Sequence, residues 1–559
     1  MVADIIRDST IGHFINFISN GKYLSYDDQR PGFIVPAHFA LTSTPASDAS
    51  GVSTLCGGRG TTTPVTVSAR EDHIAVDEKE LDKKLAYDPN IVGWYGDDDQ
   101  DNPQNWSPAK RAFVAFSISL MTFTIYIGSA IYTPSIPGIM EEFNVSLVHA
   151  TLGLTLYVLG YGIGPMFLSP LQELPALGRN TVYMATLFLF LIFQIPIFTA
   201  TNIETILAFR FLTGFFGSPA LATGGASVCD IYPPRQHAYV VGIWALGAVG
   251  GPIAGPVVGG FAAQAKGWRW PLYELVWLCA FSFPFLMLLL PETYGPTILL
   301  KRAQRLRKLT GNQQLVSQGE RDTEGDSIAQ VFKEALSRPF ILAKEPVLLF
   351  TNIYLGFVYA IFYLWFEAFP LVFSDIYQFN LGLSGLPFLG FLVSAAVTYT
   401  FYVLYQKHHI QPRFDRAKAE GRDIAPEIRL EIGVVASLSI PTSLLIFGFA
   451  SKPTVHWIVP VIGAALYLPG IYLSFQSILM YITSAYPLYA ASVLAGNDLF
   501  RSTIASVFPL FGRAFFNNLG LGPGSALLAG ISFALMPVFW SLMKWGYILR
   551  SRSKYAVSP

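Results

Sequence analysis

Charged residues are scarce in this chain. Only 13% of its 559 residues are Asp, Glu, Lys or Arg, about half of the roughly 25% that a soluble globular protein carries. The scarcity is also uneven, because 45 consecutive residues between Lys452 and Asp498 and 31 between Asp375 and Lys407 contain no charge. A soluble fold could not bury so many long apolar runs, so the composition excludes a soluble enzyme and a fibrous protein.

Other absences narrow the class further. Basic and acidic residues number 37 each, so no positive surplus points to nucleic acid. Three cysteines (Cys56, Cys229 and Cys279) are too few for a disulfide framework. The sequence has no G-x-x-x-x-G-K-[ST] loop for ATP, no H-E-x-x-H pair and no Cys/His cluster. We therefore expect that the protein is not an enzyme and binds no cofactor or metal. An ion gradient is then the energy source that remains for any transport work.

Long apolar runs are what the chain has in abundance. A membrane-spanning helix needs about 20 mostly apolar residues, and continuous runs of this length distinguish helices from the shorter alternating strands of a barrel. We predict an all-α membrane protein with twelve transmembrane helices in two bundles of six. The predicted spans are 112–134, 147–170, 180–200, 204–224, 238–262, 272–290, 347–370, 382–405, 431–450, 457–481, 488–510 and 524–545.

The distribution of basic residues predicts the orientation of these spans. With twelve spans, the side that holds both termini and the central linker carries 23 Lys and Arg, and the opposite side carries four. Because basic loops stay on the cytoplasmic side, we expect both termini in the cytoplasm.

The polar segments divide the chain into parts. We expect a partly disordered cytoplasmic tail at 1–108, a first bundle at 109–291, a cytoplasmic linker at 292–345, a second bundle at 346–546 and a cytoplasmic tail at 547–559. Residues 1–20 suit either an amphipathic helix on the membrane or a disordered end. Residues 40–70 look disordered, and the acidic run 97–99 looks solvated. In the linker, Arg302, Arg305 and Lys308 have helical spacing, which predicts a basic helix on the inner leaflet.

The fifth predicted span carries an unusual string of glycines and prolines. Gly251, Gly255 and Gly259 recur every four residues, which lets another helix backbone approach closely. Tight packing alone could explain this spacing. Together with Pro256 and Gly260, however, the string resembles the fifth-span motif of antiporters in the major facilitator superfamily.

Further motifs are similar to those of one branch of that superfamily, the fungal drug:proton antiporters with twelve spans, and the amino terminus is similar to that of yeast benomyl and azole exporters. These motifs are DNPQNW (101–106), WRW (268–270), PET (291–293), FEAFP (366–370), NDLFRS (497–502) and RDS (7–9). The resemblance implies the major facilitator fold and a plasma-membrane protein, acting as a monomer, that exports varied small molecules in exchange for protons.

The resemblance also implies a cytoplasmic gate after the second span. The usual pattern there is G-x-x-x-D-x-x-G-R, whereas this chain has Glu173 as the acid and a spacing two residues longer before Gly178 and Arg179. Asp230, at the end of the fourth span, is expected to join this cluster and latch one state of the transporter.

Four charged residues inside the predicted spans are candidates for proton coupling. A charge at the bilayer centre costs roughly 2.5–3.5 kcal/mol, so each should have a use or a partner. Arg210 matches the fourth-span arginine motif, and either tunes a carboxylate or forms a structural ion pair. Glu367 either carries a proton among aromatic residues or lies at the outer interface. Asp498 and Arg501 share one helix face, as an internal ion pair or as a pair that the proton or substrate breaks.

A substrate cavity with aromatic walls would suit flat, apolar or cationic molecules. The candidate lining residues, which could equally pack against neighbouring helices or lipid, are Tyr157, Tyr161, Trp244, Phe362, Tyr467 and Asn497. The sequence therefore predicts a proton-coupled exporter of drugs or toxins that works by alternating access. Proton-coupled uptake of a nutrient is the alternative with the same fold, and a membrane sensor without transport is a remote one.

Overall fold

The structure, a computed structural model, describes residues 2–19, 22–30, 32–33, 90–322, 328–422 and 424–557. Helices dominate this part of the chain, and its two short strands, β1 (Ile91–Val92) and β2 (Val316–Ser317), pair in parallel. The predicted all-α class is therefore confirmed. The segment 40–70, which we expected to be disordered, lies outside the described residues.

Eleven helical segments of the described chain are long and apolar enough to cross a membrane. The twelfth span is α21 (Ala490–Leu519), whose 30 residues extend for about 45 Å. Asp498, Arg501 and Arg513 make this helix more polar than its neighbours. With α21 added to these eleven, the described residues contain the twelve spans that we predicted.

The first bundle consists of six helices in chain order. They are α4 (Pro108–Ala130), α6 (Leu147–Gln172), α7 (Gly178–Phe198), α8 (Ile203–Asp230), α9 (His237–Lys266) and α10 (Trp270–Leu289).

The second bundle has the same number of spans, two of which are each divided into consecutive helices. They are α14 (Pro346–Phe369), α15 (Leu389–Tyr405), α17 (Glu431–Ser437) with α18 (Ser439–Ala450), α19 (Ile458–Ala465) with α20 (Tyr467–Ala485), α21, and α22 (Leu521–Ser551).

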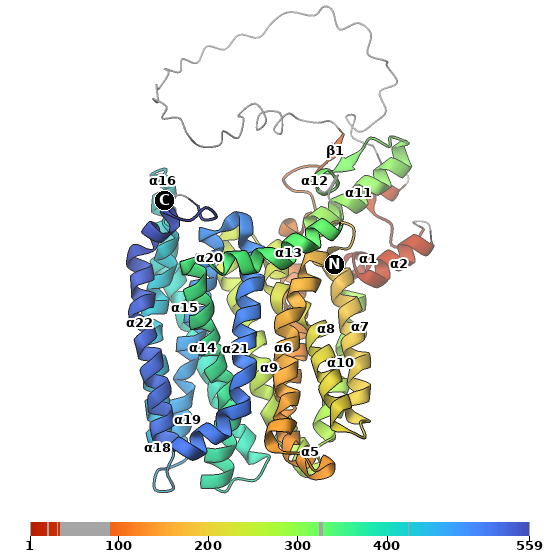
Figure 1. The fold of residues 1–559 in the computed structure, drawn as a ribbon. Coiled ribbons are helices and arrows are strands. Elements are labelled where there is room, and N and C mark those ends of the chain that lie inside the picture. Colours follow the sequence, from red (N-terminus) through yellow and green to blue (C-terminus); the bar gives the residue numbers. More distant parts are fainter. Residues whose placement is uncertain are drawn as a thin grey trace, which may run out of the picture.

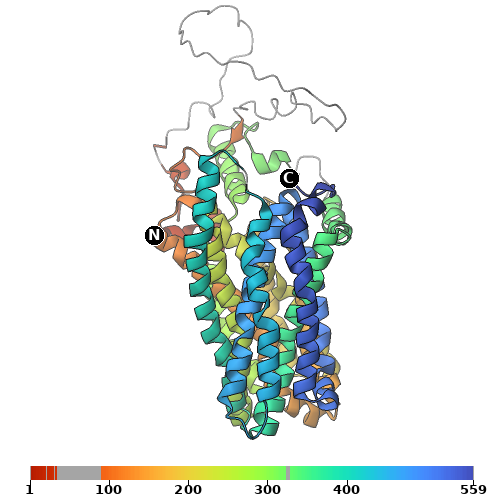
Figure 2. The same cartoon turned by 90° about the vertical axis from the view of Figure 1, so that its left-hand side faces the viewer.

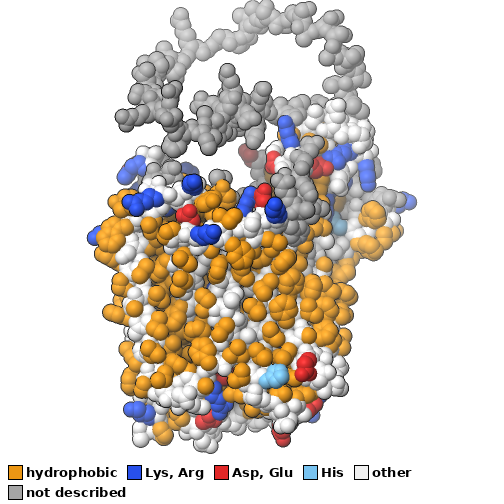
Figure 3. Space-filling model, viewed as in Figure 1, with side chains coloured by type: hydrophobic (Ala, Val, Ile, Leu, Met, Phe, Trp, Pro, Cys, Tyr) orange, Lys and Arg blue, Asp and Glu red, His pale blue; other side chains and the backbone are white. Residues whose placement is uncertain are grey.

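The spans run side by side along one axis, and both ends of the chain lie at the same end of the molecule (Figures 1 and 2). We call this the terminal end, and it also carries α1 (Val2–Arg7), α2 (Thr10–Ile18), α11 (Gly295–Thr310), α12 (Gln318–Asp322), α13 (Ile328–Leu342) and α16 (Gln411–Ala419). The short helix α5 (Ile136–Phe143) lies at the opposite end. Hydrophobic side chains form a broad belt between the two ends (Figure 3).

The linker helix α11 does not present its arginines to the membrane as predicted. Arg302 is 1% exposed and pairs with Asp99 at 2.6 Å and with Asp101 at 2.8 Å. Arg305 pairs with Asp28 at 2.8 Å. The acidic run 97–99 is accordingly not fully solvated, because the guanidinium of Arg302 draws Asp99 inward. The carboxylates of Asp28, Asp99 and Asp101 thus neutralise the face of α11 that we expected to attract lipid.

The amino-terminal segment is helical, as the amphipathic alternative predicted, but it is broken at Ser9. There the backbone N–H of Glu292 donates to the carbonyl of Asp8 at 3.1 Å. Asp8 also accepts a hydrogen bond from Lys110 at 3.1 Å. Burial acts to raise the pKa of Asp8, but Lys110 and Arg7 outweigh it and hold that pKa below its ordinary value. These contacts fix the segment against the first bundle, while Phe14, Phe17 and Ile18 of α2 stay exposed.

Candidate functional site

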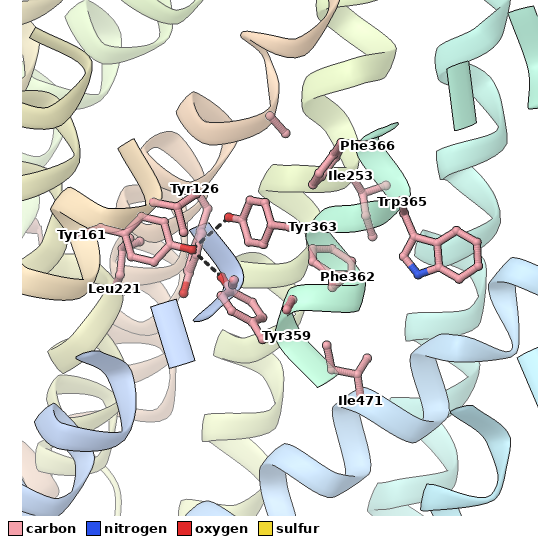
Figure 4. Close-up of a cluster of buried hydrophobic side chains, with 14 of the residues drawn as sticks. Tyr126, Tyr161, Leu221, Ile253, Tyr359, Phe362, Tyr363, Trp365, Phe366 and Ile471 are labelled. Atoms are coloured by element: carbon pink, nitrogen blue, oxygen red, sulfur yellow. Dashed lines mark hydrogen bonds between the residues drawn. The ribbon is translucent and has the colours of Figure 1, made fainter. Parts of the chain in front are cut away.

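The two bundles meet at the centre of the molecule through three tyrosines (Figure 4). The hydroxyl of Tyr161, on α6, lies 2.9 Å from that of Tyr359 and donates to that of Tyr363 at 3.0 Å, both on α14. All three side chains are buried. Because α6 and α14 belong to different bundles, the cluster closes the space between the bundles at this depth.

The predicted pair of Asp498 and Arg501 forms directly beside this cluster. Arg501 donates to one oxygen of Asp498, both residues lying on α21. The guanidinium also lies 4.5 Å from the ring centre of Tyr359 and 5.1 Å from that of Phe475. The second Asp498 oxygen and the Arg501 Nε are buried without a hydrogen-bond partner among the described residues. The pair is therefore only partly satisfied, at the place where the bundles touch.

Glu367 is buried in α14, at 7% exposure. Its side chain lies against Gly512 of α21, where an added Cβ would come within 3.2 Å of the Glu367 Cβ and Cγ. It forms no hydrogen bond or ion pair with any residue in the described part of the chain, whereas its neighbour Arg513 pairs with Asp375 at 3.0 Å. Glu367 is thus not an exposed end of the helix, although it lies two residues before the end of α14 at Phe369.

Arg210 does not meet the carboxylate that we expected beside it. It is fully buried and donates to the backbone carbonyls of Gly128, Gly153 and Ser129, at 2.7, 3.0 and 3.2 Å. The rings of Tyr157 and Tyr132 lie 4.3 and 4.6 Å from its guanidinium carbon. Carbonyl dipoles and aromatic faces thus replace an anion. The arrangement joins α8 to α4 and α6.

The predicted gate residues gather at the terminal end. Arg179, on α7, binds Asp230, at the end of α8, with Nε 2.6 Å from the carboxylate. Glu173 lies close by but forms no ion pair with Arg179 within the described chain. Burial raises the pKa of Glu173 despite the nearby guanidinium of Arg179. The residues of the predicted gate thus form an arginine–aspartate pair with a carboxyl of raised pKa beside it.

Glu292 completes this cluster and was missed as a site residue. Its carboxylate accepts hydrogen bonds from the backbone N–H groups of Arg179, Asn180, Thr293 and Tyr294, at 3.0–3.2 Å. Gly178 has φ +71°, and an added Cβ would collide with Glu292 and Thr297. The glycine of the gate motif is therefore needed for both its backbone conformation and the space it leaves. The P-E-T motif (291–293) is the sequence signal for Glu292, but by itself it indicates only the family resemblance.

The glycine string of α9 serves two interfaces. Gly251, Gly255 and Gly259 face α4, where added Cβ atoms would lie 2.6–3.0 Å from backbone atoms of residues 127 and 131. Gly260 faces the second bundle, with an added Cβ 2.9 Å from the Leu381 carbonyl, and the Pro256 carbonyl abuts Gly385. Helix α9 thus joins its own bundle along one face and touches the second bundle along another.

The six predicted cavity residues are not equivalent. Tyr161 and Phe362 lie in or beside the central tyrosine cluster. Asn497 donates to Asn352 within the second bundle at 2.9 Å, and Trp244 donates to Thr122 within the first bundle at 2.9 Å. Tyr157 donates to the Ile125 carbonyl and Tyr467 to the Val358 carbonyl, each inside its own bundle. Tyr157 and Tyr467 therefore have packing roles in this closed arrangement.

No three His, Cys, Asp or Glu side chains of the described residues gather where they could hold a metal ion. The arrangement instead offers the buried carboxylates Glu367 and Asp498 and a closed aromatic contact between the two bundles.

Several known proteins are similar to this chain in sequence and in fold. The family model described as Major Facilitator Superfamily matches residues 118–509. The chain is 44% identical to "Transporter mfs1" of Schizosaccharomyces pombe, with 83% of this chain and 88% of that protein covered. It is 40% identical to "Fluconazole resistance protein 1" of Saccharomyces cerevisiae, with 84% of this chain and 85% of that protein covered. It is 37% identical to the "Cycloheximide resistance protein" of Candida maltosa, with 99% of this chain and 100% of that protein covered.

A solved structure shows the same fold. The human organic anion transporter MFSD10 (TETRAN) superposes with a TM-score of 0.52 at 14% identity, over 78% of this chain and all of that one.

Proposed function

This chain belongs to the Major Facilitator Superfamily, and we propose that it exports drug-like small molecules from the cell in exchange for protons. The names of two relatives, a fluconazole resistance protein and a cycloheximide resistance protein, support the substrate class. The Asp498–Arg501 pair carries the proton part of the proposal, because it is buried at the contact between the bundles and only partly satisfied.

The proposed coupling follows from the electrostatics of that pair. While Asp498 is ionised, it neutralises Arg501, and the guanidinium can stay against Tyr359 and Phe475. A proton on Asp498 removes this neutralisation and leaves a buried cation, which is costly in a low-dielectric interior. Arg501 then favours an arrangement in which water or substrate reaches it, so protonation shifts the equilibrium between bundle arrangements.

Glu367 supplies a second proton acceptor nearer the opposite end. It is buried and forms no hydrogen bond or ion pair with a described residue. Arg210 has a different role in this proposal from the one that the sequence suggested. By holding three backbone carbonyls, it keeps α4, α6 and α8 together as the first bundle moves.

The gate at the terminal end would close the cytoplasmic side. In this proposal the Arg179–Asp230 pair holds α7 to α8, and Glu292 holds the turn that presents Arg179. The excess of basic residues at this end favours the cytoplasm as its location and a plasma-membrane exporter with both termini inside, acting as a monomer. Substrate would enter when the tyrosine cluster opens, among the aromatic residues of α6, α14 and α20.

The test is export by charge-neutral variants in yeast cells that lack their own exporters. The wild-type chain should lower the accumulation of radiolabelled fluconazole, and a protonophore should restore it. At equal surface abundance, Asp498→Asn and Glu367→Gln should each fail to lower fluconazole accumulation. The control Glu204→Gln, at an exposed residue, should lower it as the wild type does. Export that is unchanged in both buried variants would overturn the proposed coupling. Increased accumulation with the wild-type chain would indicate uptake instead.

A further inference from the structure

A small cavity lies inside the second bundle near the terminal end, away from the central tyrosine cluster. It is bounded by α15, by the π-helix Gln406–Ile410, by the 3-10 helix Pro426–Leu430 and by α20. Its polar lining consists of Tyr402, Tyr405, Gln406, Arg429, Gln476 and Ser477. The space accommodates about one water-sized group.

Two hydroxyl groups in this cavity lack a partner. Tyr402 is 1% exposed, and its hydroxyl is enclosed without a hydrogen bond to any described residue. The same holds for the hydroxyl of Tyr405. The side chain of Gln406 lies near the Tyr402 hydroxyl and that of Glu431 near the Tyr405 hydroxyl, but neither hydroxyl donates a hydrogen bond to a described residue. Because an unsatisfied buried polar group costs about 1–3 kcal/mol, the two donors call for an acceptor from outside the chain.

Arg429 adds a positive charge that no described carboxylate neutralises. It forms no hydrogen bond or ion pair within the described residues, and its nearest recorded contact is the ring of Phe414 at 5.3 Å. The neighbouring acids are already paired. Glu431 binds Arg413 at 2.9 Å and His409 at 3.2 Å, and Glu427 binds Arg550 at 2.7 Å. The cavity therefore offers one cation and two hydroxyl donors, which is the chemistry of an anion site.

The position of the cavity identifies the kind of anion. Just before it, α15 presents the exposed apolar side chains Val397, Phe401 and Leu404. Just after it come Lys407 and the exposed, basic α16. A change from an apolar to a basic surface within one helical turn marks the level of the lipid headgroups.

We propose that this cavity binds the phosphate of a phospholipid headgroup from the surrounding leaflet. The fork of Arg429 binds two phosphate oxygens at the mouth of the cavity, where its planar geometry matches the phosphate. One phosphate oxygen enters the small space and accepts from Tyr402 and Tyr405. The acyl chains lie along the apolar face of α15. The site is distinct from the proposed transport path and does not depend on the transported substrate.

Native mass spectrometry of the purified full chain in detergent tests this site. Phosphatidylglycerol is titrated against diacylglycerol, which has the same acyl chains but no phosphate. We expect phosphatidylglycerol to bind and diacylglycerol not to. Arg429→Gln should weaken phosphatidylglycerol binding about tenfold or more, and Tyr402→Phe by a few-fold. Arg416→Gln is the matched control, because it removes an exposed arginine at the same end, and it should bind lipid as the wild type does.

A second arm separates the lipid from a free ion. Inorganic phosphate at 10 mM (about the millimolar range of a weak anion site) is added during the titration. Binding that persists supports the headgroup, whereas displacement by phosphate in the wild type alone would overturn the lipid and leave a soluble phosphate as the ligand. Equal binding by Arg429→Gln and Arg416→Gln would overturn the site altogether and leave a water-filled cavity. Should Arg429→Gln fail to fold, phosphatidylglycerol binding by Tyr402→Phe is compared with that by the wild type. Weaker binding by Tyr402→Phe supports the site, and equal binding overturns it.

Discussion

The hydroxyl oxygens of Tyr161 and Tyr359 lie 2.9 Å apart, and the hydrogen bond between them joins the two six-helix bundles at the centre of the molecule. Alternating access requires the bundles to part at each end in turn, so this bond and the one from Tyr161 to Tyr363 are among those that must break or shift. A single such bond contributes about 0.5–1.5 kcal/mol. That contribution is large enough to bias the populations and small enough for the motion to break it.

Tyr359→Phe should therefore shift the bundle equilibrium towards an open arrangement by up to about tenfold. The shift can be measured by electron–electron resonance between spin labels on Val148 and Leu519, two exposed positions at the ends of α6 and α21. Tyr467→Phe is the control, because it removes a hydroxyl that bonds within the second bundle only. Identical distance distributions for Tyr359→Phe and the wild type would refute this role of the contact.

Gly255→Ala should destabilise the first bundle. Its Cβ would lie 2.6 Å from the backbone nitrogen of Ile131, so α4 and α9 would have to separate. Overpacking of this kind costs about 1–3 kcal/mol, which should lower the melting temperature in detergent by several degrees. Gly250→Ala, on the same helix, would meet only the Phe123 ring at 3.8 Å and should be nearly neutral. Equal melting temperatures for the two variants would count against close packing as the reason for the motif.

Glu292→Ala should disrupt the gate at the terminal end. It leaves four backbone N–H groups without their carboxylate acceptor, at about 1–3 kcal/mol for each one that stays buried and unsatisfied. Glu292→Gln should be milder, since one oxygen can keep the three bonds that reach Oε1. We expect transport and thermal stability to fall in the order wild type, Gln, Ala, with the exposed Glu141→Ala as an unaffected control. Equal stability of the Ala and Gln variants would contradict this role.

The amino-terminal segment, residues 2–19, should dock less tightly against the first bundle in acid. Burial, aided by Lys301 and Arg305 against the opposing effect of Asp8, lowers the pKa of His13 to about 3. A released segment would have the ordinary value of 6.5 and would bind a proton that the docked one excludes. Docking is therefore strongest above about pH 6.5 and weakens as the pH falls below it, about tenfold at pH 5.5.

Hydrogen exchange of residues 2–19, corrected for the intrinsic effect of pH, can follow this release. His13→Gln should remove the dependence between pH 5.5 and 7.5 because it removes the titrating group. A dependence that persists in the variant would assign the effect to another group.

The sequence predicted features that depend on local spacing. The three-residue interval brought Asp498 and Arg501 together on one turn of α21, and the four-residue glycine repeat of α9 does face another helix. Apolar run length likewise predicted the eleven helical segments that are apolar enough to cross a membrane. These predictions succeed because helical periodicity alone determines which side chains share a face.

Contacts between distant segments could not be predicted in the same way. Asp99 and Arg302 are 203 residues apart, and Asp8 and Lys110 are 102 apart. No periodicity links such positions, so the acidic run looked solvated and the linker helix looked free to meet lipid. The partners of Arg210 could not be predicted for a related reason, since they are backbone carbonyls, which a residue sequence does not distinguish.

The central claim, export driven by protons, is tested most directly with the purified chain in proteoliposomes that have an imposed pH difference. We predict that acidifying the side opposite the termini drives labelled fluconazole toward that side, and that reversing the pH difference reverses the flux. The same vesicles with Asp498→Asn should show no flux under either gradient. Substrate movement that is indifferent to the pH difference, or that runs with the protons, would contradict proton-coupled export.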